Sequence, residues 1–416
     1  MEQIMTTTLK ALPIGVQTFE AIIKGGALYV DKTKHIYDLL KGNEPKRYFF
    51  SRPRRFGKSL TCSTLDAILQ SKRELFKGLA IDEMPYNWKK HVVVYFDFNG
   101  IDHRTPEMLQ EALEEAIERN ARADKISISA KFLKSKMVEL IEQLHEKYGA
   151  VAIIVDEYDK PILDHLKDPH MVEKMREILS DFYGTFKDET IDSLVNFIFV
   201  TGVSKFSKVS LFSEQNNLDD LTYTPLASVL VGYTQTEVEH FFKGHIEALA
   251  QHEAMPVNHM KENLKNWYNG YCFEETSETV YNPFSLHKCL TYKNFTNAWF
   301  ASGTPKFFLH ALEKHPERVI EIIEEINKGT LRIASGDLDA FQIETYADSL
   351  KALFLQTGYV TFVDYNKNTG NYSLDFANLE VRKSCTEQLV KHISHVPIDK
   401  FSDIAYRLNR CLLPMI

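Results

Sequence analysis

The chain has 416 residues, of which 44% are hydrophobic and 25% are charged, and its formal net charge is −8. This composition is that of a globular protein with two or three domains, and the negative balance excludes a general attraction to nucleic acid or to an anionic membrane. Five dispersed cysteines, the lack of a membrane-length apolar run and the lack of a signal-peptide pattern predict a cytoplasmic protein with free thiols.

The first forty residues predict an extended segment followed by a short helix. Residues 27–30, ALYV, are expected to be a strand or an extended stretch, and Thr33 is a suitable N-cap for the helix. Asp31 and Lys32 stand between the two. They are typical of a solvated turn, and the alternative is that they lie beside a bound ligand.

Residues 48–59, YFFSRPRRFGKS, contain the strongest motif of the first half. An apolar strand is followed by a basic loop and then by Gly57, Lys58 and Ser59 at the start of a helix. A helix N-terminus presents free N–H groups and a positive dipole end, and glycine lets the backbone approach an anion. Lys58 can reach a phosphate and Ser59 can offer its hydroxyl to Mg²⁺, so the stretch predicts a phosphate site.

The motif departs from the usual phosphate loop at one position. The pattern G-x-x-x-x-G-K-[ST] has its first glycine where this chain has Arg52, and the following Pro53 pushes Arg52 toward an extended backbone. An ordinary helix start with a basic loop is therefore the alternative interpretation.

Two further strands carry carboxylates at their ends. Residues 91–98, HVVVYFDF, include Asp97, and the apolar run 151–155 ends in Asp156 and Glu157. Such runs are typical of a parallel sheet covered on both faces, which binds ligands at the carboxyl ends of its strands. In nucleotide hydrolases the first acid of such a pair holds Mg²⁺ and the second polarises the attacking water. We predict a nucleotide site at this pair, while Asp97 is equally compatible with a structural role.

Residues 194–206 predict another buried strand, which reaches Thr201. Thr201 can orient a water molecule or sense a phosphate, or it can simply precede a turn. Lys205 and Lys208 follow and face either a phosphate or solvent. A last strand is expected within residues 226–231, and the alternation of strands and helices predicts an α/β fold with a parallel sheet.

Two regions predict helices. Residues 105–148 carry apolar stripes at helical spacing, and their charge runs are expected on solvated helix faces. Thr234 and Glu237 form a capping-box pattern, and the residues from there to about 330 are mostly helical. The second region favours a separate helical domain.

The last part of the chain predicts a winged-helix-like segment. The expected elements are a helix, two strands and a helix at residues 348–357, 358–363, 372–374 and 379–395. Such a segment docks nucleic acid or a partner, or it serves as a structural cap, which the acidic chain favours. The expected domains are residues 1–233, 234–330 and 331–416.

Nine segments of this chain resemble the bacterial AAA-ATPase-like family, a divergent group of P-loop ATPases. The resemblance covers residues 12–391. The segments are LPIGVQTFE (12–20), YVDKT (29–33), FFSRPRRFGKSL (49–60), VDEYDKPIL (155–163), TGVSKFSKVSLFSEQNNLDDLT (201–222), WYNGY (267–271), YNPFSL (281–286), SGTP (302–305) and QTGYVT (356–361).

The resemblance implies an additional-strand P-loop NTPase fold with a parallel sheet, a helical lid and a winged-helix-like segment. It also implies that RPRRFGKS is the family's own form of the phosphate loop. By motif, ATP is bound by Gly57, Lys58, Ser59 and Asp156, and Mg²⁺ by Ser59 and Asp156.

The same resemblance implies the catalytic groups. Glu157 takes the position of the catalytic base and Thr201 that of the sensor. Arg54 and Arg55 are expected near the γ-phosphate or on a neighbouring subunit.

The family often carries a C-terminal PD-(D/E)xK nuclease-like domain, which we expect to be missing here. Lys383 stands three residues after Glu380, whereas two ligands on one strand face need a spacing of two. The leading hypothesis is a Mg²⁺-dependent ATPase that acts with a protein partner or a second copy, with nucleic acid only weakly supported. The alternatives are a nucleotide-dependent switch without turnover and a truncated remnant of an ATPase–nuclease.

Overall fold

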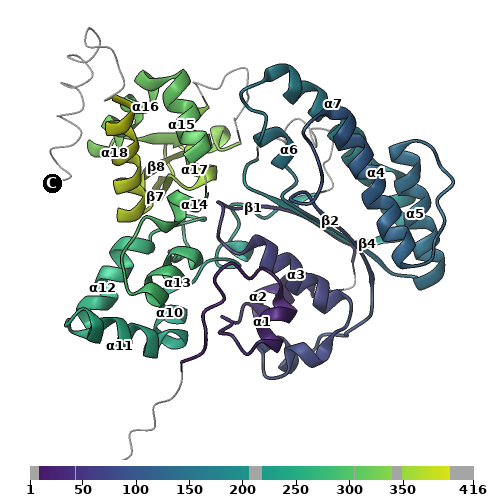
Figure 1. Cartoon of the computed structure of the whole chain (residues 1–416), viewed down its shortest axis with the longest axis horizontal. Coiled ribbons are helices and arrows are strands. Elements are labelled where there is room, and N and C mark those ends of the chain that lie inside the picture. Colours follow the sequence, from purple (N-terminus) through teal and green to yellow (C-terminus); the bar gives the residue numbers. More distant parts are fainter. Residues whose placement is uncertain (1–8, 43, 206–217, 304, 340–348, 394–416) are drawn as a thin grey trace, which may run out of the picture.

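The first half of the chain forms a parallel sheet at the centre of the molecule (Figure 1). The computed structural model describes residues 9–42, 44–205, 218–303, 305–339 and 349–393. The strand order is β2-β3-β4-β1-β5. The strands are β1 (Lys46–Ser51), β2 (Val92–Asp97), β3 (Val151–Asp156), β4 (Val195–Gly202) and β5 (Asp219–Asp220). This α/β architecture with a phosphate-loop motif after β1 is that of a P-loop NTPase.

The strand register brings the predicted polar residues to one edge of the sheet. Asp97 at the end of β2 is paired with Asp156 at the end of β3, and Phe50 of β1 is paired with Thr201 of β4. All six residues of β3 are buried, as expected for a central strand with near-continuous apolar sequence. The carboxyl ends of these parallel strands therefore lie together, where open α/β sheets bind ligands.

Helices cover both faces of this sheet. On one side lie α1 (Phe19–Lys24), α2 (Thr33–Leu40) and α3 (Lys58–Leu69); on the other lie α4 (Pro106–Ala123), α5 (Leu133–Tyr148), α7 (Pro169–Gly184) and α8 (Glu189–Leu194) (Figure 1). The short α6 (Lys160–Leu163) follows β3. The helices predicted within residues 105–148 are confirmed as α4 and α5.

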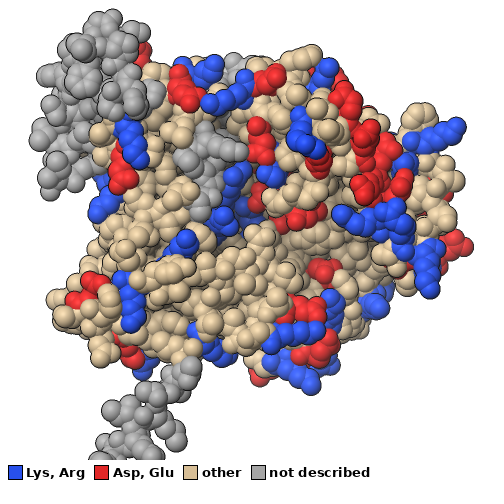
Figure 2. Space-filling view, viewed as in Figure 1, with Lys and Arg blue, Asp and Glu red and all other residues tan. Residues whose placement is uncertain are grey.

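The charged side chains of these helices lie on solvated faces. Acidic and basic residues are interspersed over α4, α5 and α7 (Figure 2). Lys136 of α5, for example, pairs with Glu114 and Glu118 of α4. The prediction that the charge runs are solvated helix faces is confirmed.

One strand prediction is wrong. Residues 226–231 form a short 3-10 turn and bends instead of a strand, whereas residues 27–30 are extended, which is one of the two expectations for them. The edge strand is instead the two-residue β5. Ala227, Leu230 and Val231 are nevertheless buried, because this turn folds over the loop that follows β1. A short apolar run alone does not distinguish a buried turn from a strand.

The second half packs against the carboxyl edge of the sheet. Its helices are α10 (Gln235–Phe241), α11 (Lys243–His252), α12 (Val257–Tyr268), α13 (Pro283–Tyr292), α14 (Ala298–Gly303), α15 (Pro305–Lys314), α16 (Pro316–Asn327), α17 (Leu350–Thr357) and α18 (Leu379–Ile393). An antiparallel sheet of order β6-β8-β7 joins β6 (Arg332–Ala334), β7 (Val360–Asn366) and β8 (Asn371–Phe376). Within the described ranges, no helix has the length and apolarity needed to cross a bilayer.

The predicted order of elements in the last part is confirmed by α17, β7, β8 and α18. Residue 348 and residues 394–395 of those predictions lie outside the described residues. Thr234 and Glu237 form the expected capping box at the start of α10.

Candidate functional site

A cavity of about 370 Å³ lies between the phosphate-loop motif and the second half of the chain. Its lining includes residues 54–61, Asp97 and Glu157, which we call the polar end. We call the rest of the lining, which comes from segments far apart in the sequence and is rich in apolar side chains, the apolar end. A cavity of this size with one polar and one apolar end is typical of a small-molecule site.

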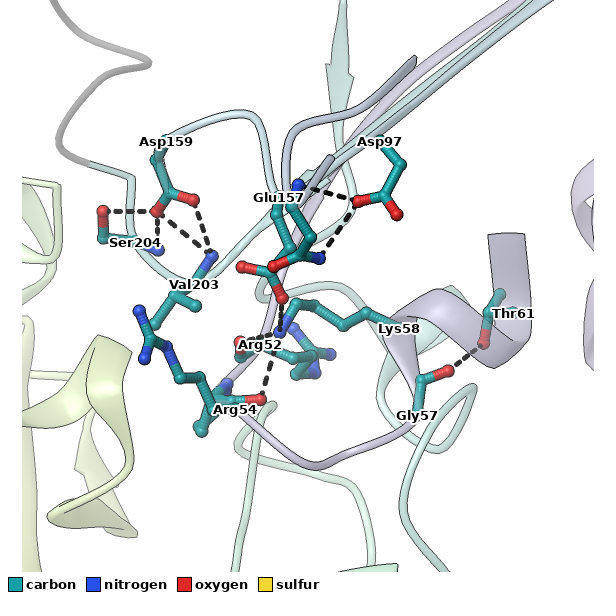
Figure 3. Close-up of polar contacts among 12 residues, drawn as sticks. Arg52, Arg54, Gly57, Lys58, Thr61, Asp97, Glu157, Asp159, Val203 and Ser204 are labelled. Carbon is teal, nitrogen blue, oxygen red and sulfur yellow. Dashed lines mark hydrogen bonds and ion pairs between the residues drawn. The ribbon is translucent and has the colours of Figure 1, made fainter. Parts of the chain in front are cut away.

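The loop before α3 presents Lys58 to the polar end. Gly57 adopts φ +101°, a left-handed conformation that glycine favours, and it leads directly into the helix. The Lys58 ammonium donates to the carbonyl oxygens of Arg52 at 3.1 Å and Pro53 at 3.4 Å, and lies 3.6 Å from Glu157 Oε1 (Figure 3). The lysine thus points into the cradle made by the loop and the acid pair, where an anion would meet it.

Asp156 lies at the end of β3, behind the loop, and is 2% exposed. Burial, reinforced by the charge of Glu157, raises the pKa of Asp156 to about 7, while a hydrogen bond from Ser59 acts in the opposite direction. Its Oδ1 has no hydrogen-bond partner in the part of the chain that the structure describes. A buried carboxylate with an unpartnered oxygen is costly unless a cation approaches it.

The donor set of Asp156 and Ser59 fits Mg²⁺. Mg²⁺ is usually held by one or two carboxylates together with water and substrate phosphates. Among the described residues, no group of three or more His, Cys, Asp or Glu side chains could enclose a metal. The unpartnered Oδ1 next to a hydroxyl therefore suits a metal that arrives with a phosphate rather than a protein-enclosed ion.

Glu157 is held in a strained backbone conformation. Its φ of +56° is left-handed, which is uncommon for a residue with a Cβ and costs of the order of 1 kcal/mol or more. The neighbouring Tyr158 N–H donates to the carbonyl oxygen of Thr201 at 3.0 Å, which fixes this turn to the end of β4. The turn aims the Glu157 carboxylate into the cavity instead of along the sheet.

Arg52, at the position of the first glycine, has a structural role. It is 1% exposed, and its guanidinium donates to the carbonyl oxygens of Ser51 and Ala227 at 2.9 Å and to that of Thr222. It also lies over the rings of Phe50 and Phe273, 4.6 and 4.1 Å from their centroids. Burial lowers the pKa of Arg52 to about 9.

The bend that a first glycine would supply lies elsewhere in the loop. Arg55 has φ +68° and Gly57 has φ +101°. Arg52 itself remains on the side of the loop away from the cavity, so its presence does not block the phosphate cradle.

The other predicted catalytic residues are placed differently. Arg54 and Arg55 line the cavity, and the Arg55 guanidinium lies 4.9 Å from the centroid of the Phe284 ring. Thr201 is fully buried within the sheet and is not among the described residues that line the cavity. Its Oγ1 has no hydrogen-bond partner among the described residues.

Asp97 faces the cavity. Its Oδ1 accepts hydrogen bonds from the backbone N–H of Asn99 at 2.9 Å and from the side-chain amide of Asn99 at 3.0 Å. Both residues line the cavity, to which the turn presents Asp97.

The predictions for Asp31, Lys32 and Lys205 are refined or corrected. Asp31 caps its own turn by accepting from Thr33, and Lys32 lines the cavity while pairing with Glu237 at 2.6 Å. Lys205 faces neither a phosphate nor solvent, because it is 4% exposed and pairs with Asp220 at 2.8 Å. Lys208 lies outside the described residues.

Sequence reasoning missed the apolar end of the cavity. Its lining includes residues 13–17, residues 230–233 and, from α13, Pro283, Phe284 and His287. Tyr233 and His287 share a hydrogen bond of 3.2 Å there, and burial lowers the pKa of His287 to about 3, so its ring is neutral. Residues 13–17 lie within the segment LPIGVQTFE, and Pro283 and Phe284 lie within YNPFSL, two of the segments that carry the family resemblance. Nothing in the sequence indicated that the two segments would meet in the fold.

Comparison with known proteins gave a family match, a sequence relative and structural neighbours. A family model described as a predicted AAA-ATPase matches residues 13–212. An uncharacterised protein in the vnfD 5′ region of Azotobacter chroococcum mcd 1 is 36% identical over 386 residues, which cover 92% of this chain and 70% of that protein. Two solved structures from Aeropyrum pernix also match.

The first is the ORC1 protein in complex with DNA, with 12% identity, a TM-score of 0.30 and coverage of 90% of this chain and 94% of that chain. The second is the ORC2 protein in its ADP form, with 13% identity, a TM-score of 0.38 and coverage of 92% of each chain.

Proposed function

This chain belongs to the AAA-ATPase-like family, and from that membership we propose that it binds ATP with Mg²⁺ in the cavity and hydrolyses it. The apolar end would take the base, and the polar end the phosphates. Domain boundaries near residues 233 and 330, with a helical lid and a winged-helix-like segment after them, are part of the same proposal. The pairing of β6 with β8 and of β8 with β7 supports that last assignment.

The observation that carries the proposal is that Lys58 and Glu157 line one end of the cavity, with the buried Asp156 directly before Glu157 in the chain. A cation 3.6 Å from one carboxylate, and a second carboxylate with an unpartnered buried oxygen, suit a phosphate and a metal. Neither carboxylate is explained by the packing of the sheet, where buried charges are costly.

Each residue has a role in this proposal. Lys58 and the N–H groups at the start of α3 bind the phosphates, and Ser59 and Asp156 hold Mg²⁺. The metal, when bound, neutralises phosphate charge. Glu157 orients and deprotonates the attacking water, and Thr201 takes the sensor position. Arg54 and Arg55 act near the γ-phosphate or on a neighbouring copy.

One observation favours a second function, a switch without significant turnover. The Glu157 carboxylate faces Lys58, so in this conformation the catalytic base is paired with a cation. Turnover requires that phosphate replace Glu157 as the partner of Lys58. Without that exchange the protein would bind nucleotide and change state without hydrolysing it.

The test is to measure binding and turnover of ATP by the purified chain, with and without Mg²⁺. We expect Lys58→Met to lose at least tenfold in affinity, and Glu157→Gln to keep binding while turnover falls at least a hundredfold. Lys72→Met and Glu142→Gln are matched controls, because Lys72 pairs with Glu20 at 3.1 Å away from the cavity and Glu142 is exposed on α5.

Each outcome decides between the proposals. Binding without turnover in the parent chain would favour the switch. If Lys58→Met binds and hydrolyses ATP like the parent, the site assignment is wrong.

A further inference from the structure

The turn that carries Glu157 is hydrogen-bonded to the turn that follows β4. Asp159 is fully buried, and it accepts from the backbone N–H groups of Val203 and Ser204, at 3.1 and 2.8 Å, and from the Ser204 hydroxyl at 2.9 Å (Figure 3). Tyr158 donates its hydroxyl to the carbonyl oxygen of Ser204 at 2.8 Å. These hydrogen bonds tie the two residues after Glu157 to residues 203–204.

The next residue, Lys205, is held by the last part of the chain. Its backbone N–H donates to Gln356 Oε1 at 2.9 Å, and its ammonium pairs with Asp220 at 2.8 Å and with Asp339. Gln356 in turn donates to the carbonyl oxygen of Leu338 at 2.7 Å. The turn after β4 is thus bonded on one side to Tyr158 and Asp159, which directly follow the acid pair, and on the other to helix α17.

Helix α17 faces inward. Seven of its eight residues are buried, and it ends at Gly358, where φ is +86° and an added Cβ would lie 2.8 Å from Pro53. The helix therefore touches both the phosphate loop and the β4 turn. In helix-turn-helix proteins a helix that reads DNA presents exposed side chains to a groove. The burial of α17 leaves it no such surface.

We propose that residues 350–376, α17 with its hairpin, regulate the nucleotide site, and that Lys205 and Gln356 are the positioning residues that connect the two. This inference rests on the proposed function. When a bound phosphate replaces Glu157 as the partner of Lys58, the turn that carries Glu157 relaxes, and Asp159 transmits the shift to residues 203–205. The contacts of Lys205 with Gln356 and Asp339 then change.

Lys205 carries a buried charge that is compensated by two carboxylates. The residue is 4% exposed and pairs with both Asp220 and Asp339. Loss of the Asp339 contact leaves Asp220 as a partner but reduces the compensation of a charge in the protein interior, which is unfavourable. Linkage is reciprocal. An event that displaces α17 therefore changes the free energy of nucleotide binding by the same amount as bound nucleotide changes the free energy of displacing α17.

The experiment is hydrogen–deuterium exchange on peptides from residues 350–376, with and without Mg²⁺ and ATPγS, together with the affinity for ATPγS. In the parent chain we expect bound nucleotide to change the exchange of α17 at least threefold. In Lys205→Met, affinity should stay within about threefold while that exchange response is lost, and Lys205→Arg should restore it. Lys351→Met is the matched control, because Lys351 lies on α17 but pairs with Glu325 at 2.6 Å.

Asp339→Asn provides a milder second variant in case Lys205→Met does not fold, because the Asp339 side chain is 45% exposed. It should reduce the exchange response while retaining affinity. If the parent binds ATPγS and α17 does not respond, or if Lys205→Met and Asp339→Asn respond like the parent, the inference is overturned and the nucleotide site stands. If the parent binds no ATPγS, both the inference and the proposed function fail.

Discussion

The two sides of the loop 52–59 differ in what their charged groups contact. On the cavity side, Lys58 lies near the Glu157 carboxylate, and the buried Asp156 leaves one oxygen without a partner. On the opposite side, the Arg52 guanidinium donates to three carbonyl oxygens and lies between two aromatic rings. The first side is suited to receive a ligand, and the second to hold the loop still.

The second side also explains a sequence segment that carried no function by itself. Phe56 packs edge-to-face against Tyr271 and Phe273, with centroids 4.7 and 5.4 Å apart. Tyr271 ends the WYNGY segment, and the Trp299 indole donates to the carbonyl oxygen of Arg54 at 3.0 Å. These aromatics support the loop, so a precise phosphate cradle depends on residues more than two hundred positions away.

Replacing Arg52 tests the structural side and should have the largest effect on stability. Arg52→Met keeps the length of the side chain but leaves three buried carbonyl oxygens without their donor, which should lower the free energy of unfolding by about 3–5 kcal/mol. Urea denaturation measures the loss. Arg55→Met is the matched control: Arg55 is exposed and stacks on one ring, so its change should stay below about 1 kcal/mol. Equal losses of unfolding free energy in Arg52→Met and Arg55→Met would contradict the structural role of Arg52.

Replacing Asp156 tests the cavity side and should change binding instead of stability. Asp156→Asn removes the carboxylate expected to hold Mg²⁺, so the Mg²⁺ concentration needed for half-maximal ATP binding should rise at least tenfold. The nucleotide-free variant should be as stable as the parent at pH 8, or more so, because a buried charge is removed. Calorimetric titration at several Mg²⁺ concentrations gives the first quantity. A large loss of stability with unchanged Mg²⁺ dependence would reverse the assignment.

Glu380 offers a smaller, pH-dependent test of how the second half is held behind the loop. Its carboxylate accepts from the Trp299 backbone N–H at 2.8 Å and from the Ser285 hydroxyl at 3.0 Å. Burial, the largest influence, raises the pKa of Glu380 to about 8, above the usual 4.5. Its contribution to stability is therefore fully present below pH 4.5 and is lost as the pH rises through about 8.

The unfolding free energy of the parent should fall between pH 5 and pH 9. In Glu380→Gln this fall should be smaller by about 1–3 kcal/mol. Urea midpoints at pH 5, 7 and 9 measure this difference. Glu387→Gln, at an exposed position further along α18, is the control and should follow the parent. Parallel curves for all three proteins would show that Glu380 does not titrate in this window.

The sequence was most informative where a local pattern had one physical interpretation. The continuous apolar runs of β3 and β4 predicted buried parallel strands, and the motif Gly57-Lys58-Ser59 predicted a helix N-terminus. It was least informative for residues 226–231, because burial of a short apolar run occurs in turns as well as in strands. The roles of Thr201, Arg54 and Arg55 stay predictions.

By itself, the sequence determined the parallel α/β sheet, the phosphate-loop motif and the acid pair, because hydrophobic periodicity and strand-end polarity are local properties. The tertiary structure alone decided that Arg52 is a buried support, that residues 13–17 meet residues 283–287 around the cavity, and that Lys205 is held by α17. These outcomes depend on contacts between residues that are distant in the sequence. The free energy of a charged side chain depends on how deeply it is buried and on which groups surround it, and no local sequence pattern specifies those distant groups.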